Sequence, residues 1–226
     1  MTTFIGFGDD ALAFYDGLEA DNSKTYWIDH QEVFERAVRG PMLALLADLE
    51  PEFGVAKVFR PHRDVRFSAD KSPYKTQLGA VVHTGSGTPD GGGLYVALSA
   101  CGLFAGGGYY QLAKDQLERY RAAVIDDAAG RTLKRITDTL AGAGLELSGQ
   151  TLLRSPRGVD PNHPRIDLLR RKGLAAGIDL GAPDWLATPA CRDQVAGVWR
   201  RLAPMLAWLA AQVGPTREPA EQRGRR

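Results

Sequence analysis

Basic side chains are concentrated in residues 59–76, which read FRPHRDVRFSADKSPYKT. This stretch holds five lysines and arginines against two aspartates, so three of its positive charges lack a local carboxylate. Two cations about 6 Å apart repel each other by roughly 3 kcal/mol at an effective dielectric constant near 20. The cluster therefore requires either carboxylates from elsewhere in the chain or a bound anion.

The same stretch predicts an extended segment followed by a turn. If residues 60–67 are extended, their side chains alternate between two faces. One face, which is almost wholly ionic, then carries Arg60, His62, Asp64 and Arg66. Residues 68–73 predict a turn, because Asp and Ser side chains bond to nearby backbone and Pro73 holds Ser72 out of the helical region. We expect the cations after this turn to fold back toward those before it.

A second basic segment, residues 154–172, reads RSPRGVDPNHPRIDLLRRK and holds six cations against two aspartates. The two segments together carry a net charge of +7 within a chain of net charge +1, so positive charge is gathered rather than spread. Three prolines and Asn162 predict a rigid loop that holds Arg157, Asp160 and His163 in fixed positions. An Arg157–Asp160 ion pair that only ties down the loop is an equally open interpretation.

We predict that the two segments form a site for a small anion, such as a phosphate or carboxylate group. Arginine binds such groups bidentately through its planar fork, and lysine adds point charge. The anion would contact Arg63, Arg66, Lys71 and Lys75, with Arg157 closing from the second segment and Asp64 orienting one arginine. The predicted ligand-binding residues are Arg60, Arg63, Asp64, Arg66, Ser68, Asp70, Lys71, Tyr74, Lys75, Gly107, Arg157, Asp160 and His163.

Gly107 enters this set because glycines 106–108 end a predicted strand just before Tyr109 and permit close backbone approach. A bulge, or a sharp exit from the strand, explains the same glycines without a ligand.

Two further functions stay open. Phe59, Phe67 and Tyr74 alternate with cations, as in surfaces that stack the bases of single-stranded nucleic acid. Alternatively, the charges form an internal ion-pair network in a non-catalytic structural or interaction module. Whether the protein is an enzyme also stays open, and no catalytic residue is assigned. An acid or base would come from Asp64, Asp70, His62 or His163.

Several motifs along the chain resemble one protein family. The motif RDVRFSADKSPYKT, the opening FIGF, residues 22–27, GGGYY and SPRGVDPNHP are similar to a bacterial family described as domain of unknown function 2461, in order over roughly residues 4–175. The resemblance implies a soluble bacterial protein without an established activity, and it gives no substrate.

Composition predicts an ordinary globular protein, with 44% hydrophobic and 24% charged residues in 226. Cys101 and Cys191 form no CxxC pair, and the four histidines show no ligand spacing, so we predict neither a metal site nor a cofactor. No signal peptide and no run of 18 apolar residues is found. We therefore expect a cytoplasmic protein without membrane contact, and the sequence predicts no oligomeric state.

Hydrophobic periodicity predicts an α+β fold, in which a mainly antiparallel meander packs against N-terminal, middle and C-terminal helices. Residues 1–213 are expected to form a single domain, followed by a disordered polar tail at 214–226. A helix break is expected at Gly40-Pro41. Expected helices cover residues 9–20, 23–39, 41–50, 114–128, 131–140, 166–172 and 188–213. Expected strands cover 56–59, 78–83, 94–99, 103–105, 145–147, 152–153 and 175–180.

Overall fold

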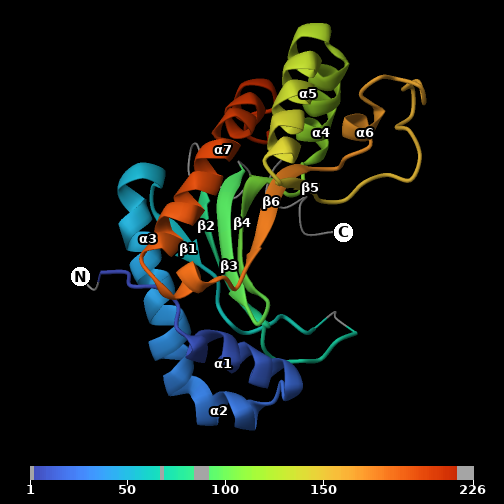
Figure 1. The fold of residues 1–226 in the computed structure, drawn as a ribbon. Helices are drawn as coiled ribbons and strands as arrows, with labels where there is room; N and C mark the ends of the chain where they lie inside the picture. The colour runs from blue at the N-terminus through green and yellow to red at the C-terminus, as the bar shows by residue number, and fades with distance from the viewer. Residues whose placement is uncertain (1–2, 67–68, 84–91, 218–226) are drawn as a thin grey trace. The chain divides into compact units, whose positions relative to one another are not determined.

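The structure is a computed structural model, and it describes residues 3–66, 69–83 and 92–217. The predicted α+β class is confirmed: a six-stranded antiparallel sheet is accompanied by N-terminal, middle and C-terminal helices (Figure 1). The strands are β1 (Ala56–Val58), β2 (Gln77–His83), β3 (Gly93–Ser99), β4 (Gly102–Tyr109), β5 (Glu146–Ser148) and β6 (Leu174–Gly181).

The chain forms two compact units. Unit 1 comprises the residues up to Val82 together with Tyr95–Ala105 and Asp179–Gly197. Unit 2 comprises His83–Leu94, Gly106–Ile178 and the residues from Val198 onward. Strands β2, β3, β4 and β6 each contain residues of both units.

The strand order is β1-β2-β3-β4-β6-β5. The first four strands follow one another as the predicted meander, whereas β6 lies between β4 and β5. Strand β1 sets the register that matters for the basic segment, because Val58 pairs with Ala80 of β2. The predicted strand at residues 152–153 is wrong: only Thr151 forms an isolated bridge, to Arg171.

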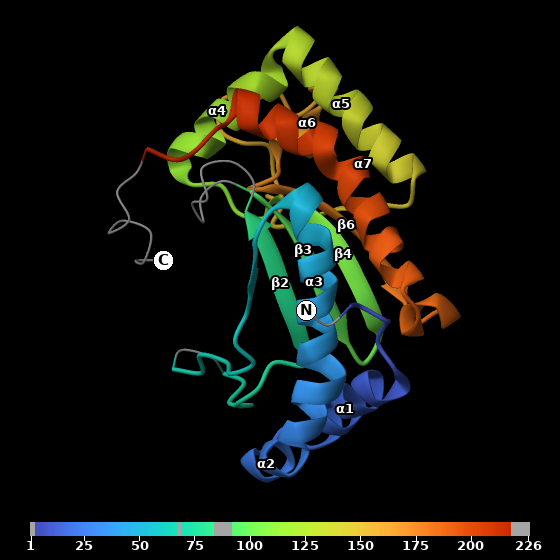
Figure 2. The ribbon, with the colours of Figure 1, turned by 90° about the vertical axis from the view of Figure 1, so that its left-hand side faces the viewer.

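The N-terminal helices of unit 1 are α1 (Asp9–Ala20), α2 (Lys24–Val33) and α3 (Gly40–Phe53), drawn together in Figure 2. Ser23 caps α2, since its hydroxyl accepts a hydrogen bond of 3.1 Å from the Tyr26 amide. The Phe14 ring packs against the rings of Trp27 and Phe34, with centroids 5.9 and 5.4 Å away. Aromatic packing therefore joins α1 to the helices that follow it.

The predicted helix break at Gly40-Pro41 is wrong. A π-helical segment, Phe34–Arg39, connects α2 to α3, so the helical path from Lys24 to Phe53 has no interruption. The Gly40 amide donates to the Glu35 carbonyl, five residues earlier. Pro41, which has no amide hydrogen, lies in the first turn of α3, directly after the π-helical segment.

The helices of unit 2 include α4 (Lys114–Ile125), α5 (Asp127–Gly142) and α6 (Ile166–Leu169). Asp126 separates the first two and caps α5, because its carboxylate accepts a 2.8 Å hydrogen bond from the Ala129 amide. The buried Tyr120 of α4 donates its hydroxyl to the Leu168 carbonyl of α6 over 3.0 Å.

Helix α7 (Ala190–Gln212) begins in unit 1, ends in unit 2, and contains Pro204. In unit 2, Trp208 of α7 donates its indole N–H to the Ala129 carbonyl of α5 over 3.0 Å. No helix in the described part of the chain is long and apolar enough to span a bilayer.

Part of the expected tail is ordered against α4. Asp115 accepts hydrogen bonds from the Thr216 hydroxyl, at 2.6 Å, and from the Arg217 amide, at 2.8 Å. The rest of the predicted tail, residues 218–226, lies outside the described residues.

We expect Tyr120→Phe to lower the free energy of unfolding by about 1 kcal/mol, because the hydroxyl bond to Leu168 is lost. The cost stays modest, since the same carbonyl also accepts from the Arg171 amide at 3.1 Å. Urea denaturation followed by tryptophan fluorescence measures the change. Tyr110→Phe is the control, because that side chain is 69% exposed. Equal destabilisation by both variants would contradict this assignment.

Candidate functional site

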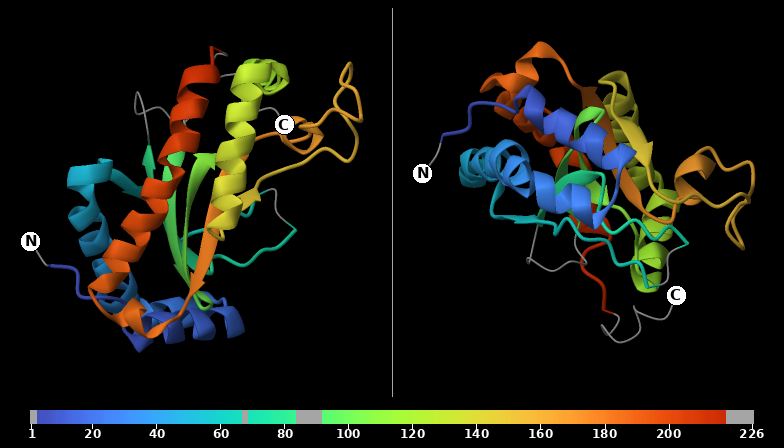
Figure 3. Two further views of the ribbon diagram at one scale, coloured as in Figure 1. Left: turned by 45° about the horizontal axis from the view of Figure 1, so that its top comes forward. Right: turned by 90° about the horizontal axis from the view of Figure 1, so that it is seen from below.

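Residues 59–76 form a long connection between β1 and β2, which we call the basic arm (Figure 3). The Phe59 amide donates to the Gly79 carbonyl over 2.9 Å, and the chain then leaves the sheet. Its two sides meet again farther out: the Arg63 amide donates to Pro73, and the Lys75 amide to Pro61, over 2.9 and 2.8 Å. The predicted folding back of the chain is confirmed.

Exposure along the arm alternates as an extended segment requires. Pro61, Arg63 and Val65 are partly covered, whereas His62, Asp64 and Arg66 are exposed. The exposed residues His62, Asp64 and Arg66 belong to the face that the sequence predicts to be ionic.

The arm is anchored to the N-terminal helices of unit 1 through Asn22. The Asn22 amide nitrogen donates to the Tyr74 carbonyl, and its oxygen accepts from the Tyr74 amide, both at 3.1 Å. The Tyr74 ring stacks on Trp27, with centroids 4.4 Å apart and planes 10° apart. With only 5% of its surface exposed, Tyr74 lies in the anchor of the arm rather than on an open ligand face.

Two arginines of the arm are paired with its two aspartates. Arg63 forms an ion pair with Asp70. Arg66 donates two hydrogen bonds to the Asp64 carboxylate, of 2.9 and 2.7 Å. Asp70 also accepts from the Ser72 amide and hydroxyl, at 2.9 and 2.6 Å, which builds the predicted turn.

Hydrogen bonding keeps both carboxylates ionised. Bonds from the Arg66 side chain and backbone lower the pKa of Asp64 to about 2. Bonds from Ser72, and then the ion pair with Arg63, lower the pKa of Asp70 to about 2. Both negative charges of the arm are therefore present at neutral pH and are already engaged by arginine.

Three cations of the arm, Arg60, Lys71 and Lys75, have no carboxylate partner among the described residues. Lys71 donates to the Val65 carbonyl over 3.0 Å, and the Lys75 ammonium lies 5.4 Å from the centre of the Phe59 ring. Burial, and then the charge of Arg60, lower the pKa of Lys75 below its usual 10.5. Unpaired positive charge thus gathers at the base of the arm, where Arg60 acts on Lys75, and Lys71 adds a further unpaired cation in the outer arm.

The lowered pKa of Lys75 makes the stability of the fold depend on pH. The unfolded chain holds the Lys75 proton up to a higher pH than the folded chain does. Charged Lys75 therefore weakens folding, and this cost disappears as the pH rises through its folded pKa toward 10.5.

The second basic segment belongs to unit 2, where residues 149–165 loop outward between β5 and α6 (Figure 1). Asp160 accepts from the Asn162 amide at 2.8 Å, and the His163 ring accepts from the Arg165 amide at 3.1 Å. Both side chains thus close local turns. The Arg157–Asp160 ion pair does not form, and Arg157 is exposed.

Gly107, the remaining predicted residue of unit 2, is buried in β4. A Cβ at this position would lie 2.9 Å from the Gly93 carbonyl oxygen, so strand packing itself accounts for the glycine. The predicted residues therefore divide between the units: Gly107, Arg157, Asp160 and His163 lie in unit 2 and the others lie in the arm. Of these, Ser68 is outside the described residues.

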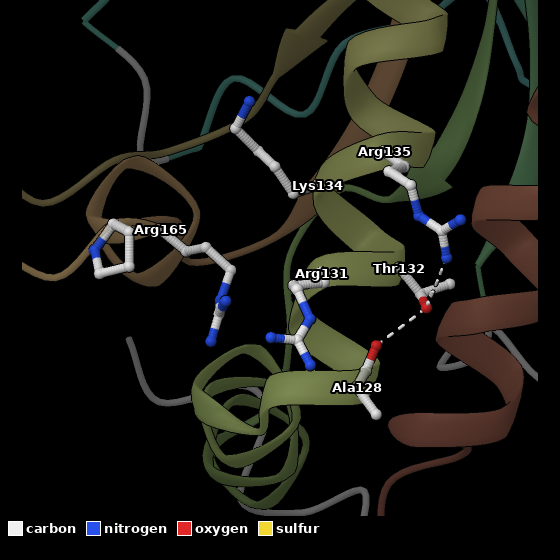
Figure 4. Close-up of a pocket in the computed structure, with 7 residues that line it drawn as sticks. Ala128, Arg131, Thr132, Lys134, Arg135 and Arg165 are labelled. Atoms are coloured by element: carbon white, nitrogen blue, oxygen red, sulfur yellow. Dashed lines mark hydrogen bonds between the residues drawn. The ribbon is translucent and has the colours of Figure 1, made fainter.

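Unit 2 also contains a hollow of about 540 Å³ beside α5, shown in Figure 4. It is lined by Ala128, Arg131, Thr132, Lys134, Arg135, Pro164 and Arg165. The α5 hollow is not predicted from the sequence, because three of its cations look like the solvated face of an ordinary helix. The available signal was their spacing at 131, 134 and 135, which places them on one side of a helix.

No three His, Cys, Asp or Glu side chains in the described part of the chain gather in an arrangement that could hold a metal ion. Cys101 is exposed and Cys191 is buried, and both are free thiols. Burial raises the pKa of the Cys191 thiol to about 12, so this sulfur stays protonated at neutral pH.

A family model described as "Conserved hypothetical protein (DUF2461)" matches residues 10–208. The match spans most of the chain, so the chain belongs to this family, and the resemblance of the sequence motifs is confirmed. It includes the basic arm, its anchor and the α5 hollow. No curated protein shows significant similarity to the chain.

We expect Asn22→Ala to release the arm, because it leaves both backbone groups of Tyr74 without their side-chain partner at a cost of about 1–3 kcal/mol. Hydrogen exchange of the Tyr74 amide should accelerate. Asn162→Ala is the matched control, since Asn162 uses only its backbone amide in the bond to Asp160. Unchanged exchange at Tyr74 in the Asn22 variant would show that the arm is held by other contacts.

Proposed function

We propose that the protein binds a small anion, bearing a phosphate or carboxylate group, at the base of the basic arm. The observation that carries the proposal is that Arg60 and Lys75, whose charges meet at the base of the arm, lack a carboxylate partner among the described residues, as does Lys71 farther out along the arm. A bound anion would offset the repulsion between Arg60 and Lys75 and raise the pKa of Lys75 back toward its usual value.

Arg63 and Arg66 take a different role from the one that the sequence suggests. Each is engaged by an aspartate of the arm, so neither contributes net charge to a ligand. These pairs fix the shape of the outer arm. Arg60 and Lys75 supply the charge for binding, and Lys71 adds a cation farther out along the arm.

A compact anion suits this arrangement better than a long polyanion. The whole chain carries a net charge of only +1, whereas binding along a polyanion normally requires a broadly basic surface. Charge held at one place favours a ligand with one or two negative charges at one end.

We propose that the protein binds the anion, and we assign no reaction to it. Asp64 and Asp70 have pKa values of about 2 and are occupied by arginine, so neither donates a proton at neutral pH. The proposed setting is the cytoplasm of a bacterium. The free thiols of Cys101 and Cys191 support a reducing compartment.

Single-stranded nucleic acid is the second candidate ligand. Phe59 is 37% exposed and lies beneath the Lys75 ammonium, an arrangement that stacks a base while holding a phosphate. Salt dependence separates the two ligands, because nucleic-acid binding releases several counterions and weakens steeply as salt increases.

Calorimetric titration with inorganic phosphate and sulfate tests the proposal. We expect a Kd of about 1 mM or tighter, and about tenfold weaker binding for each of Arg60→Gln and Lys75→Gln, since one charge-assisted hydrogen bond is lost. Arg39→Gln is the control, because it removes a cation that is already paired with Glu35 in the same unit. Anion binding that is absent, or unaffected by the arm variants, would refute the proposal.

Titration of the same proteins with oligothymidine decides between the two ligands. A flat plot of log K against log salt, or no binding, supports the small anion. Tight binding with a steep negative slope, lost in the Lys75 and Phe59→Ala variants, would establish nucleic acid as the ligand instead.

A further inference from the structure

The α5 hollow carries more positive than negative charge. Its lining includes four cations and no carboxylate. A second hollow of about 250 Å³ shares Thr132 and Arg135 with it and adds Arg201 of α7. All of these residues belong to unit 2.

The carboxylates near the α5 hollow are too few for its cations. Asp127 serves two guanidinium groups, with one oxygen 3.2 Å from Arg131 and the other 3.5 Å from Arg165. Lys134 uses Asp138, at 2.7 Å. Arg135 donates to the Thr132 hydroxyl over 3.4 Å and has no carboxylate partner among the described residues. Positive charge therefore exceeds negative charge at this surface.

Arg165 is a fixed element of the α5 hollow. Its side chain is 9% exposed, and it donates to the Val124 and Ile125 carbonyls at the end of α4, over 2.7 and 3.0 Å. These carbonyls would otherwise lack partners at the helix terminus. A Cβ on Gly130 would lie 2.6 Å from the Arg165 Nε, so a glycine inside α5 leaves the space that this guanidinium occupies.

The other cations of the α5 hollow are free to adapt. Arg131 and Lys134 sit in exposed i,i+4 ion pairs, which contribute little to stability and are readily exchanged for another anion. Figure 4 shows the guanidinium groups of Arg131 and Arg165 near one another, with Arg135 directed toward Thr132. A fixed charge flanked by adaptable ones is a suitable arrangement for an anionic group.

We propose that the α5 hollow is a second anion-binding site, for a small molecule that joins a phosphate or carboxylate group to an apolar body. Arg131 and Arg135 contact the anionic group, and Arg165 supplies a fixed positive charge. Ala128 and Pro164 border this end, and Ile136, Leu140 and Pro204 line the adjoining hollow and accept the apolar body. The site goes beyond the proposed function of the arm, because it uses different residues in the other unit.

Phenyl phosphate is a suitable probe, with inorganic phosphate and phenol as its two halves. We expect phenyl phosphate to shift the amide resonances of α5 between Arg131 and Arg135, and to bind there at least tenfold more tightly than inorganic phosphate. Phenol alone should leave these resonances unchanged. Inorganic phosphate binding as tightly as phenyl phosphate would overturn the apolar part of the proposal.

Variants locate the binding. Arg131→Gln and Arg135→Gln should each weaken phenyl phosphate binding about tenfold, whereas Lys114→Gln, an exposed position of unit 2 outside the hollow, should not. Arg165 is left intact because it holds the end of α4. Loss of α5 shifts in Arg60→Gln or Lys75→Gln, with the α5 variants unaffected, would assign all binding to the arm and overturn the second site. This test is independent of the proposed function of the arm, because loss of sulfate binding in the arm variants would not alter the α5 shifts expected with phenyl phosphate.

Discussion

Cations held close together in a folded chain need negative charge nearby. The basic arm meets this requirement only in part. Its two aspartates are engaged by Arg63 and Arg66, and its other three cations have no carboxylate among the described residues. The α5 hollow shows the same imbalance in another form, because Asp127 alone serves both Arg131 and Arg165. In both places a ligand would supply the missing charge.

Neither cationic surface holds its shape by charge alone. The arm is fixed at its base by backbone hydrogen bonds between its two sides, and by Asn22, which pairs with both backbone groups of Tyr74. Stacking of Tyr74 on Trp27 adds a buried apolar contact. In the α5 hollow, Arg165 is held by the carbonyls that end α4. Hydrogen bonds to neutral groups and aromatic stacking thus hold the charged side chains in place, even where no carboxylate of the protein pairs with them.

Local features of the sequence predicted local structure well. The alternation along the arm and the Asp70 turn each depend on neighbouring residues, and both were predicted. Features that depend on distant contacts were not. The π-helical connection before Gly40 replaced an expected break, and the position of β6 beside β4 does not follow from strand order along the chain. The α5 hollow was missed because Arg165 binds carbonyls about forty residues earlier in the chain.

The side-chain pKa of Lys75 tests the central claim most directly. Nuclear magnetic resonance of the lysine side chains, recorded with and without saturating sulfate, gives this value for each lysine. The account predicts that Lys75 titrates below its usual 10.5 in the free protein and moves upward when sulfate binds. A Lys75 pKa that is normal in the free protein, or that sulfate leaves unchanged, would show that the base of the arm is not an anion site.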